Sequence, residues 1–390
     1  MITTASAYPS VLLGDVCRFI GGGTPSRKRD DYFNGNIPWA TVKDFKTFRI
    51  FDTEDHISEA GLADSASNLV PAGTVLLVTR VGLGKVAIAE QSLAINQDIK
   101  AVIPTPEIIP EFLFWFLLSK GSEIERMGAG ATVKGVTLND VRSIKMPLPP
   151  LDEQRRIVDI LSRADGIIRL RREAQKKTAE IIPALFFDTF GDPATNPKEW
   201  DVVSLSEICG KCLTHDPRKQ PDDTFFYIDI TAIDNQRGRI ANTKVLLGAD
   251  APSRARQIVR VGDILVSTVR PNLRGSAFVP IELDGQICST GFCVLRPLNN
   301  ATSAFIYALV RSDWFVGELI QNVRGAQYPA VSDKDVFSLT LPLPPLDLQN
   351  SFAEVVEQIR SIQSQQFAAT AKAEAAFEAL LGHTFREGTL

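Results

Sequence analysis

Short apolar runs separated by Gly, Pro, Asn and Asp predict many short strands along the chain. The runs TVLLVTR (residues 74–80) and DILVSTVR (residues 263–270) are rich in β-branched side chains, which favour strands. The segments PEFLFWFLLSKGSEIERM (110–127) and SAFIYALVRSDWFVGELI (303–320) predict helices. Because β-rich runs with a few helical segments come first in each half and a long helical pattern follows them, the sequence indicates an α+β fold.

Two longer segments have the seven-residue apolar spacing of helices that pair with each other. Each follows a Pro-Leu-Pro-Pro sequence, and prolines cannot extend a helix backwards, so Asp152 and Asp347 are expected to be the N-caps. Pro183 is expected to kink or end the first helix. The predicted seam is interrupted by Arg171 and Gln366, and its members are Ile157, Ile160, Ala164, Ile167, Ala174, Thr178, Ile181 and Leu185 in the first helix and Phe352, Val355, Ile359, Ile362, Ala369, Ala373, Ala376 and Leu380 in the second.

The seam predicts a two-helix coiled coil, although each helix packing only on its own neighbouring domain is the alternative. About 30 residues at a rise of 1.5 Å would make a rod of about 45 Å. If the two helices pair antiparallel, they separate the two remaining parts of the chain and relate them by a pseudo-twofold axis.

The chain repeats itself after half of its length. The segment GATVKGVTLNDVRSIKMPLPPL (130–151) corresponds to GAQYPAVSDKDVFSLTLPLPPL (325–346), and FLFWFLLS (112–119) corresponds to FIYALVRS (305–312). Only the hydrophobic outline is shared between the middles of the two halves. The predicted domains are therefore a globular module at 1–145, a spacer helix at 146–190, a second module at 191–340 and a second spacer helix at 341–390.

Bulk composition adds few constraints on function. A chain of 390 residues exceeds the usual size of one core, which agrees with two modules. There is no apolar run of about 18 residues and no signal-peptide pattern, so a cytoplasmic location is expected. The net charge of −4 gives no general sign of nucleic-acid binding, so any such surface must come from local clusters.

The five cysteines are expected to be reduced thiols. Cys209, Cys212, Cys288 and Cys293 have spacings that a zinc site could use. However, Cys17 and Cys209 end the matching segments LGDVC and LSEIC, which favours ordinary apolar positions of a repeat. We therefore predict no metal site.

Sequence motifs of common enzymes are absent. There is no phosphate-binding G-x-x-x-x-G-K-[ST] loop, no G-x-S-x-G elbow and no H-E-x-x-H pair. The Gly21–Gly23 stretch superficially resembles an S-adenosylmethionine loop, but neither the helix nor the catalytic loop of a methyltransferase accompanies it. No catalytic residues are therefore predicted in this chain.

Basic and amide side chains cluster in the segments between the apolar runs. Arg, Asn and Gln can bond base edges, and Lys and Arg can bond phosphates, so these clusters predict DNA contacts. The candidates are Arg27, Lys28, Arg29, Lys43, Arg80, Lys85 and Lys134 in the first module, and Arg218, Lys219, Asn235, Arg237, Arg239, Arg270, Asn272, Arg274, Arg324 and Gln327 in the second.

The segments PLPPLDEQRRI and PLPPLDLQ, together with GGGTPSRKRDDYFNGNIPWATVKDF and FFDTFGDPATNPKEWDVVSLSEIC, resemble the specificity subunits of type I restriction–modification systems. The resemblance covers essentially the whole chain. It implies two target-recognition domains, each reading one half of an asymmetric bipartite DNA site, and an antiparallel helical spacer between them. It also implies a non-catalytic subunit, since methylation is carried out by partners.

The resemblance further implies that the spacer docks two DNA methyltransferase subunits, and that motor-nuclease subunits can join them. S-adenosylmethionine, ATP and Mg are expected on these partners and no cofactor on this chain. The expected docking positions are Leu151, Asp152 and Gln154 in the first copy, and Leu346, Asp347 and Gln349 in the second. In the second copy LDLQNSF replaces LDEQRRI, so its docking contacts are expected to differ. The alternative is a two-headed DNA- or protein-binding scaffold without such partners.

Overall fold

The structure, a computed structural model, describes residues 8–129, 135–325 and 329–386, and the chain divides into two compact units. Unit 1 comprises Met1–Arg172 and Ala369–Leu390, and unit 2 comprises Glu173–Ala368. Each unit therefore contains the start of one long helix and the end of the other. The predicted boundaries after residues 145, 190 and 340 divide the chain by sequence alone, and they stay predictions.

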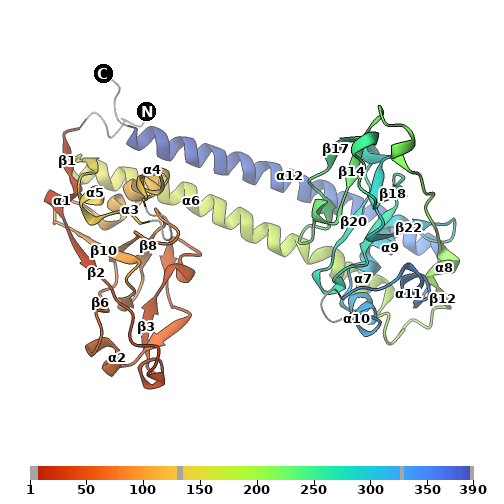
Figure 1. Cartoon of the computed structure of the whole chain (residues 1–390), viewed down its shortest axis with the longest axis horizontal. Helices are drawn as coiled ribbons and strands as arrows, with labels where there is room; N and C mark the ends of the chain where they lie inside the picture. The colour runs from red at the N-terminus through yellow and green to blue at the C-terminus, as the bar shows by residue number, and fades with distance from the viewer. Residues whose placement is uncertain (1–7, 130–134, 326–328, 387–390) are drawn as a thin grey trace. The chain divides into compact units, whose positions relative to one another are not determined.

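Unit 1 contains two larger sheets (Figure 1). The five-stranded sheet has the order β2 (Cys17–Gly21), β10 (Ile99–Pro104), β7 (Val75–Val78), β8 (Val86–Ala89) and β4 (Arg49–Ile50). The four-stranded sheet has the order β5 (Asp55–Ile57), β3 (Ile37–Ala40), β9 (Leu93–Ile95) and β6 (Asn68–Val70). The two ends of the module are joined by a short antiparallel strand pair, β1 (Ser10–Leu12) with β11 (Lys145–Pro147). The short helices of the module are α1 (Leu13–Val16), α2 (Glu59–Ala63), α3 (Pro110–Ser119), α4 (Gly121–Met127) and α5 (Leu138–Arg142).

Unit 2 has the same strand order, with one additional edge strand. Its larger sheet has the order β13 (Cys209–Gly210), β22 (Phe292–Pro297), β19 (Ile264–Ser267), β20 (Ser276–Phe278), β16 (Arg239–Ile240) and β15 (Ile233–Asp234). The smaller sheet has the order β17 (Lys244–Leu247), β14 (Thr224–Ile228), β21 (Ile287–Ser289) and β18 (Ala255–Ile258). The end strands are β12 (Val202–Ser204) and β23 (Thr340–Pro342), and the short helices are α8 (Leu205–Ile208), α9 (Ser303–Val310), α10 (Asp313–Gln321) and α11 (Asp333–Phe337). The matching order, including a parallel pair at the same place in each smaller sheet, agrees with the repeat seen in the sequence.

The central strand β7 explains why the run TVLLVTR is apolar throughout. Val75 and Leu77 join a core with α3 and the long helices, whereas Leu76 and Val78 join a second core with β9 of the other sheet. A strand buried on both faces needs apolar side chains at every position. In unit 2, Ile264 and Leu265 of β19 divide between two cores in the same way.

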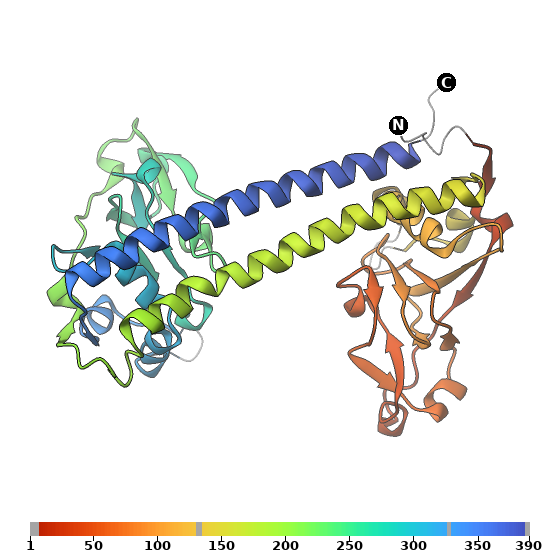
Figure 2. The ribbon, with the colours of Figure 1, turned by 180° about the vertical axis from the view of Figure 1, so that it is seen from behind.

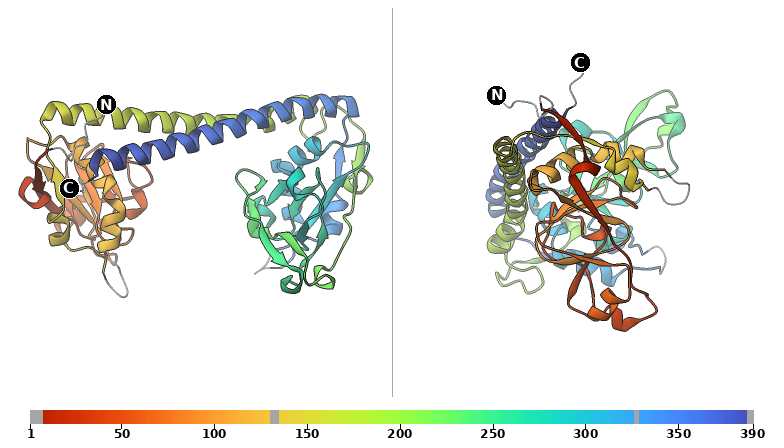
Figure 3. Two further views of the ribbon diagram at one scale, coloured as in Figure 1. Left: turned by 90° about the horizontal axis from the view of Figure 1, so that it is seen from above. Right: turned by 90° about the vertical axis from the view of Figure 1, so that its left-hand side faces the viewer.

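The long helices are α6 (Leu151–Ala179), α7 (Ile181–Phe190) and α12 (Leu346–Phe385), and in each unit they lie on one side of the sheets (Figure 3). The break between α6 and α7 lies at Glu180, three residues before Pro183, as predicted, because proline has no N–H for the bond that would continue the helix. The matching stretch of α12 has Glu378 at this position and is unbroken. None of the helices in the described part of the chain is long and apolar enough to cross a membrane.

The prediction that Asp152 and Asp347 are N-caps is wrong. The backbone N–H groups of Glu153 and Gln154 both donate to the carbonyl of Pro150, at 3.0 Å, so α6 begins immediately after this proline. Pro345 accepts the corresponding bonds at the start of α12. Asp152 instead lies in the first helical turn, where a negative charge is favourable, and its carboxylate pairs with Arg155 at 2.6 Å.

Helix α12 runs antiparallel to the first long helix in both units (Figure 2). In unit 1, Arg172 pairs with Glu374 at 2.6 Å. In unit 2, Gln175 donates to the carbonyl of Gln366 at 3.2 Å, and Gln363 donates to the carbonyl of Thr178 at 2.8 Å. From one bonded pair to the next, the residue numbers rise on the first helix and fall on α12, so the two helices run antiparallel.

One of the two predicted seam rows is wrong by one residue. The first predicted row is at least partly buried, and it contains Ile157, Ala164, Thr178 and their equivalents in α12. The second predicted row has exposed side chains at Ile167, Ala174 and Ile181 of the first helix and at Val355, Ile362 and Ala376 of α12. The buried row instead contains Gln154, Leu161 and Ile168 on α6, and Gln349, Val356, Thr370, Phe377 and Thr384 on α12. The prediction followed mainly the bulky aliphatic residues, whereas the buried row also contains Gln154 and Gln349, which bond backbone groups of their own unit. Gln366 is part of the seam, because its side chain accepts from the Thr178 hydroxyl at 2.9 Å, whereas Arg171 is exposed outside it.

Candidate nucleic-acid interface

The described basic candidates of unit 1 are all exposed and lie in three segments. Arg27, Lys28 and Arg29 are in the connection from β2 to the short helix η2 (Asp30–Tyr32), and Lys43 is in η3 (Val42–Asp44). Arg80 and Lys85 lie at the two ends of the β7–β8 loop. Lys134 lies outside the described residues.

The first of these segments is organised by its own aromatic side chains. The guanidinium of Arg29 pairs with Asp31 at 2.7 Å and lies 4.5 Å from the centre of the Tyr32 ring. The hydrogen bond to Asp31 raises the pKa of Arg29, so this side chain stays charged. Arg27 lies over Phe33, at 5.3 Å, and has no carboxylate partner within the described chain. The segment therefore presents ordered cations rather than freely moving ones.

The candidates of unit 2 divide into ion-paired and unpaired side chains. Four arginines pair with nearby carboxylates: Arg218 with Asp216 at 3.0 Å, Arg237 with Asp234 at 3.1 Å, Arg324 with Asp335 at 3.2 Å, and Arg274 with Asp313. Lys219, Arg239 and Arg270 are exposed and have no ion-pair partner among the described residues. Asn272 is exposed and Asn235 is half-buried, while Gln327 falls outside the described residues. The three unpaired cations can approach a phosphate without first breaking an ion pair.

Two equivalent loops combine strained backbone with a cation, Lys85 or Arg270, that has no ion-pair partner among the described residues, whereas Arg80 of the first loop pairs with Asp98 at 3.8 Å. In the β7–β8 loop Val81 has a φ of 49°, and in the corresponding β19–β20 loop Arg270 has a φ of 51°. A β-branched residue in the left-handed region is costly, of order 1–3 kcal/mol, and such strain gathers at binding sites. Each loop also exposes one apolar side chain, Val81 in unit 1 and Leu273 in unit 2. These loops are the best-supported centre of the candidate interface in each unit.

The predicted docking residues divide into exposed and buried groups. Leu151, Asp152, Leu346 and Asp347 are exposed. Gln154 and Gln349 are fully buried and use their amide groups internally, so the prediction that they contact a partner is wrong. A side chain without exposed surface cannot dock another protein.

The two buried glutamines form the same connection in both units. The Gln154 side-chain carbonyl accepts from the Ile109 N–H at 2.9 Å, and its amide donates to the carbonyls of Glu107 and Pro149, each at 2.9 Å. The Gln349 side chain accepts from the Thr302 N–H at 2.9 Å and donates to the carbonyls of Asn300 and Pro344. Each glutamine thereby ties the start of a long helix to the segment that precedes α3 or α9.

The row that the seam prediction selected is instead an exposed apolar row. Ile167 and Ile362 are equivalent in the repeat, and each is 52% exposed. Ile181 and Val355 extend the row on their own helices, and Leu151 and Leu346 are exposed at the helix starts. The sequence pattern had assigned Ile167, Ile181, Val355 and Ile362 to the helix–helix contact, and Leu151 and Leu346 to docking. Their exposure makes them candidates for contact with another protein.

The cysteines do not form a metal site within the described residues, where no group of three or more metal-ligating side chains comes together. Cys17, Cys209, Cys288 and Cys293 are buried. Burial raises the pKa of the Cys209 thiol to about 12, so this group is not a nucleophile at neutral pH.

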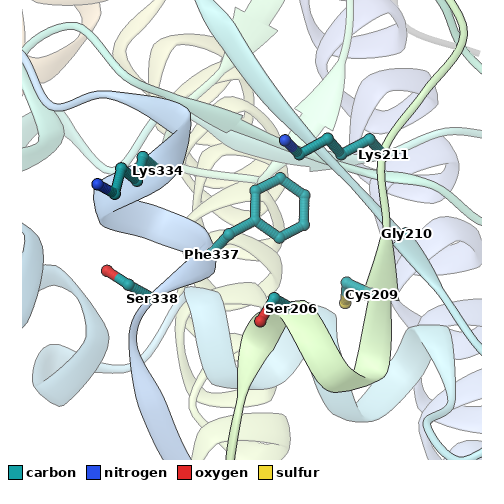
Figure 4. A pocket seen from close by; sticks show the side chains of 7 residues that line it. All are labelled: Ser206, Cys209, Gly210, Lys211, Lys334, Phe337 and Ser338. Atoms are coloured by element: carbon teal, nitrogen blue, oxygen red, sulfur yellow. The ribbon is translucent and has the colours of Figure 1, made fainter.

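A pocket beside α11 is lined by Cys209 and two lysines, Lys211 and Lys334 (Figure 4). Its central contact is structural: the Lys211 ammonium lies 5.9 Å from the centre of the Phe337 ring. Unit 1 has the same contact with the roles exchanged, since Arg142 lies 5.7 Å from Phe19 at the corresponding positions. The exchange preserves a cation–ring contact between β2, or the residue after β13, and the last short helix of each module, α5 or α11, which accounts for these residues without a ligand.

Comparison with known proteins gives a consistent result. The family model described as type I restriction modification DNA specificity domain matches residues 7–180 and again residues 197–372. The MjaIX specificity subunit of Methanocaldococcus jannaschii is 23% identical, over 88% of this chain and 85% of that one. The EcoR124I/EcoR124II specificity subunit of Escherichia coli is 34% identical, but the match spans only 43% of this chain and 44% of that relative.

Solved structures support the fold over nearly the whole chain. A chain from work on complex assembly and conformational transition of the type I R-M system has a TM-score of 0.60 at 20% identity, and the match covers 98% of both chains. The type I restriction–modification S subunit from M. genitalium has a TM-score of 0.56 at 15% identity, covering 98% of this chain and 97% of the other. Since the family model matches both halves of the sequence, this chain belongs to the type I restriction–modification DNA specificity family and is a specificity subunit.

Proposed function

We propose that this specificity subunit, which is not itself an enzyme, recognises an asymmetric bipartite DNA site and directs two DNA methyltransferase subunits to it. The observation that carries the proposal is the duplicated design: two modules share one strand order, and each is joined to a long helix through the same buried glutamine. Duplicated architecture suits a target with two parts. The loop sequences differ between the two modules, which suits the recognition of two different half-sites.

DNA reading is assigned to the two strained loops and the basic segments beside them. Arg270 and Asn272 in unit 2 are exposed, and their side chains can bond base edges. Lys85 in unit 1 and Lys219 in unit 2 are suited to phosphates, which accept from lysine at any sequence. The ion-paired arginines remain candidates, but each would exchange a carboxylate for a phosphate on binding.

The long helices are proposed to act as an antiparallel coiled-coil spacer of fixed length that relates the modules by a pseudo-twofold axis. This role is supported by the cross-helix bonds of Gln175, Thr178 and Gln363 in unit 2 and by the Arg172–Glu374 pair in unit 1. B-DNA presents the same groove about every 34–36 Å, so a reader pair needs a defined spacing to reach one face of the duplex. A paired helix is stiff enough to set that spacing, whereas a flexible linker is not.

Methyltransferase docking is assigned to the exposed apolar row of the long helices. Ile167 and Ile362 occupy equivalent positions, so the row offers the same contact twice, once for each partner copy. S-adenosylmethionine is then expected on the methyltransferase partners. ATP and Mg are expected on motor-nuclease subunits where these are present.

Methylome sequencing of cells with and without this chain tests the proposal directly. The expected result is one adenine-methylated motif with two short specified parts and a fixed gap, present only with the chain. Co-purification should recover two methyltransferase subunits per chain. A methylome that does not change when the chain is removed would overturn the proposal.

A further inference from the structure

The turn of residues 235–238, which joins β15 and β16 in unit 2, is held in place by α9 and the residue that follows it. The Arg311 guanidinium donates to the carbonyls of Asn235 and Gln236, at 3.3 and 3.2 Å. The Tyr307 hydroxyl donates to the carbonyl of Gly238 at 2.7 Å. Gly238 has a φ of 62°, and a Cβ at this position would lie 2.1 Å from the Tyr307 hydroxyl oxygen. The backbone of the turn is thus seated directly on these two side chains.

Helix α12 holds the same turn from a second direction. The Arg360 guanidinium lies 4.6 Å from the ring centre of Tyr307 and 5.2 Å from that of Phe278. The Arg237 guanidinium, which belongs to the turn, lies 4.8 Å from the ring centre of Phe367. Arg360 and Phe367 are seven residues apart, so they share one side of the helix. Both contacts are between a cation and a ring face, which fixes orientation as well as distance.

Arg360 is otherwise poorly compensated in this position. Burial lowers its pKa, and its Nη2 atom is enclosed without an acceptor in the described part of the chain. No described carboxylate forms an ion pair with it. The buried guanidinium of Arg360 has lost most of its contact with water, so it is stabilised by the Tyr307 and Phe278 rings. The same contact holds Tyr307 in place under the turn.

Unit 1 holds the corresponding segment by different chemistry. There Phe48, which precedes β4, packs at 5.5 Å from Phe114 and 5.9 Å from Trp115. In the repeat, Phe114 takes the place of Tyr307. On the long helix, Asp165 and Arg172 take the places of Arg360 and Phe367. The cation–ring link from the long helix to the turn is therefore particular to unit 2.

We propose that Arg360 and Phe367 of α12 are positioning residues for DNA recognition by unit 2, acting through the turn 235–238. The turn carries exposed Gln236 and leads into exposed Arg239, and both side chains can bond base edges. Neither Arg360 nor Phe367 needs to touch DNA for this role. Because the same helix carries the proposed methyltransferase-docking row, the base-reading turn and the docking helix share a direct contact. The inference rests on the proposed DNA-recognition function and adds residues that control it.

The test measures base discrimination at each half-site separately. The chain is co-purified with its methyltransferase partner, and methylation rates are compared between the bipartite target and duplexes with one changed base pair. Phe367→Leu removes the ring face but keeps an apolar side chain, and Arg360→Met removes the charge but keeps the length. Each is expected to lower discrimination roughly threefold to tenfold at one half-site, the half-site that also responds to Gln236→Ala, and to leave the other unchanged.

Two matched variants separate positioning from simple packing. Phe367→Tyr keeps the ring face and should behave as the wild type. Arg172→Leu changes the equivalent position in unit 1 and should leave discrimination at the unit 2 half-site unchanged. The inference is overturned if Phe367→Leu and Arg360→Met stay within twofold of the wild type at every position, if both half-sites lose discrimination equally, or if Phe367→Tyr fails as Phe367→Leu does. A wild-type complex that methylates no bipartite motif would instead overturn the proposed function.

Discussion

Replacing Gln154 by leucine should selectively destabilise unit 1. Leucine keeps most of the side-chain volume but removes the three hydrogen bonds to Ile109, Glu107 and Pro149. A buried polar group left without a partner costs about 1–3 kcal/mol. The bonds to Ile109 and Glu107 are only partly buried, so water can recover some of their energy, and each should cost about 1 kcal/mol. The Pro149 bond is buried, which brings the expected total to roughly 3–5 kcal/mol.

Thermal unfolding followed by calorimetry provides the measurement. For a domain of this size 1 kcal/mol shifts the Tm by about 2–4 °C, so Gln154→Leu should lower the Tm of unit 1 by roughly 6–20 °C. Gln349→Leu should lower the Tm of unit 2 in the same way, because that side chain makes the equivalent bonds. The two effects should add in the double variant, since the sites share no partners.

Arg155→Ala is the matched control for this experiment. It lies one residue from Gln154 on the same helix, and its ion pair with Asp152 is exposed, so its loss should cost no more than about 1 kcal/mol. If Gln154→Leu shifts the Tm no further than Arg155→Ala does, the buried glutamine does not stabilise the junction. Equal shifts in the transitions of both units would also refute the reasoning.

Other variants test the helix surface, an acidic group and the absence of metal. Ile167→Glu and Ile362→Glu should each reduce the recovered methyltransferase from two copies to one without lowering the Tm, and retention of both copies in the double variant would contradict the docking row. Burial raises the pKa of Asp165, so its ionised form opposes folding above that pKa. Asp165→Asn should therefore raise the Tm at pH 7 and have no effect on it well below pH 4. A lower Tm at pH 7 would show that the ion pair with Arg169 dominates. Treatment with a chelator should leave the Tm of the isolated chain unchanged, and a loss of several degrees would show a structural metal.

The repeat and the main strands could be predicted because they depend on local composition. The runs containing β7 and β19 are apolar at every position, since both faces of each strand are buried. The smaller sheet was harder to predict, because strands such as β5 and β6 have three residues each and partly exposed surfaces. A three-residue strand has too short a pattern to reveal its period.

The partners of the site residues could not be predicted, because they depend on contacts distant in sequence. The exposure of Arg274 follows from its charge, but its pair with Asp313 joins residues 39 positions apart. No sequence pattern marks Arg360, and only the fold places it against Tyr307. Gln154 belongs to a motif that occurs twice, and the family resemblance implied a docking role for it, although the residue acts inside the chain rather than on a partner.

Polar residues, not apolar ones, set the register of the helix pair where it is best defined. Within unit 2, the Thr178 hydroxyl donates to the Gln366 side chain at 2.9 Å, and Gln175 and Gln363 bond backbone carbonyls of the facing helix. Aliphatic side chains tolerate a slip of one heptad, since one leucine packs much like another. Polar groups do not, because each loses its partner, at a cost of about 1 kcal/mol for bonds that are part-buried as these are. If the helix pair is the proposed spacer, its register determines the gap between the half-sites, so the accuracy of that gap depends on these four side chains.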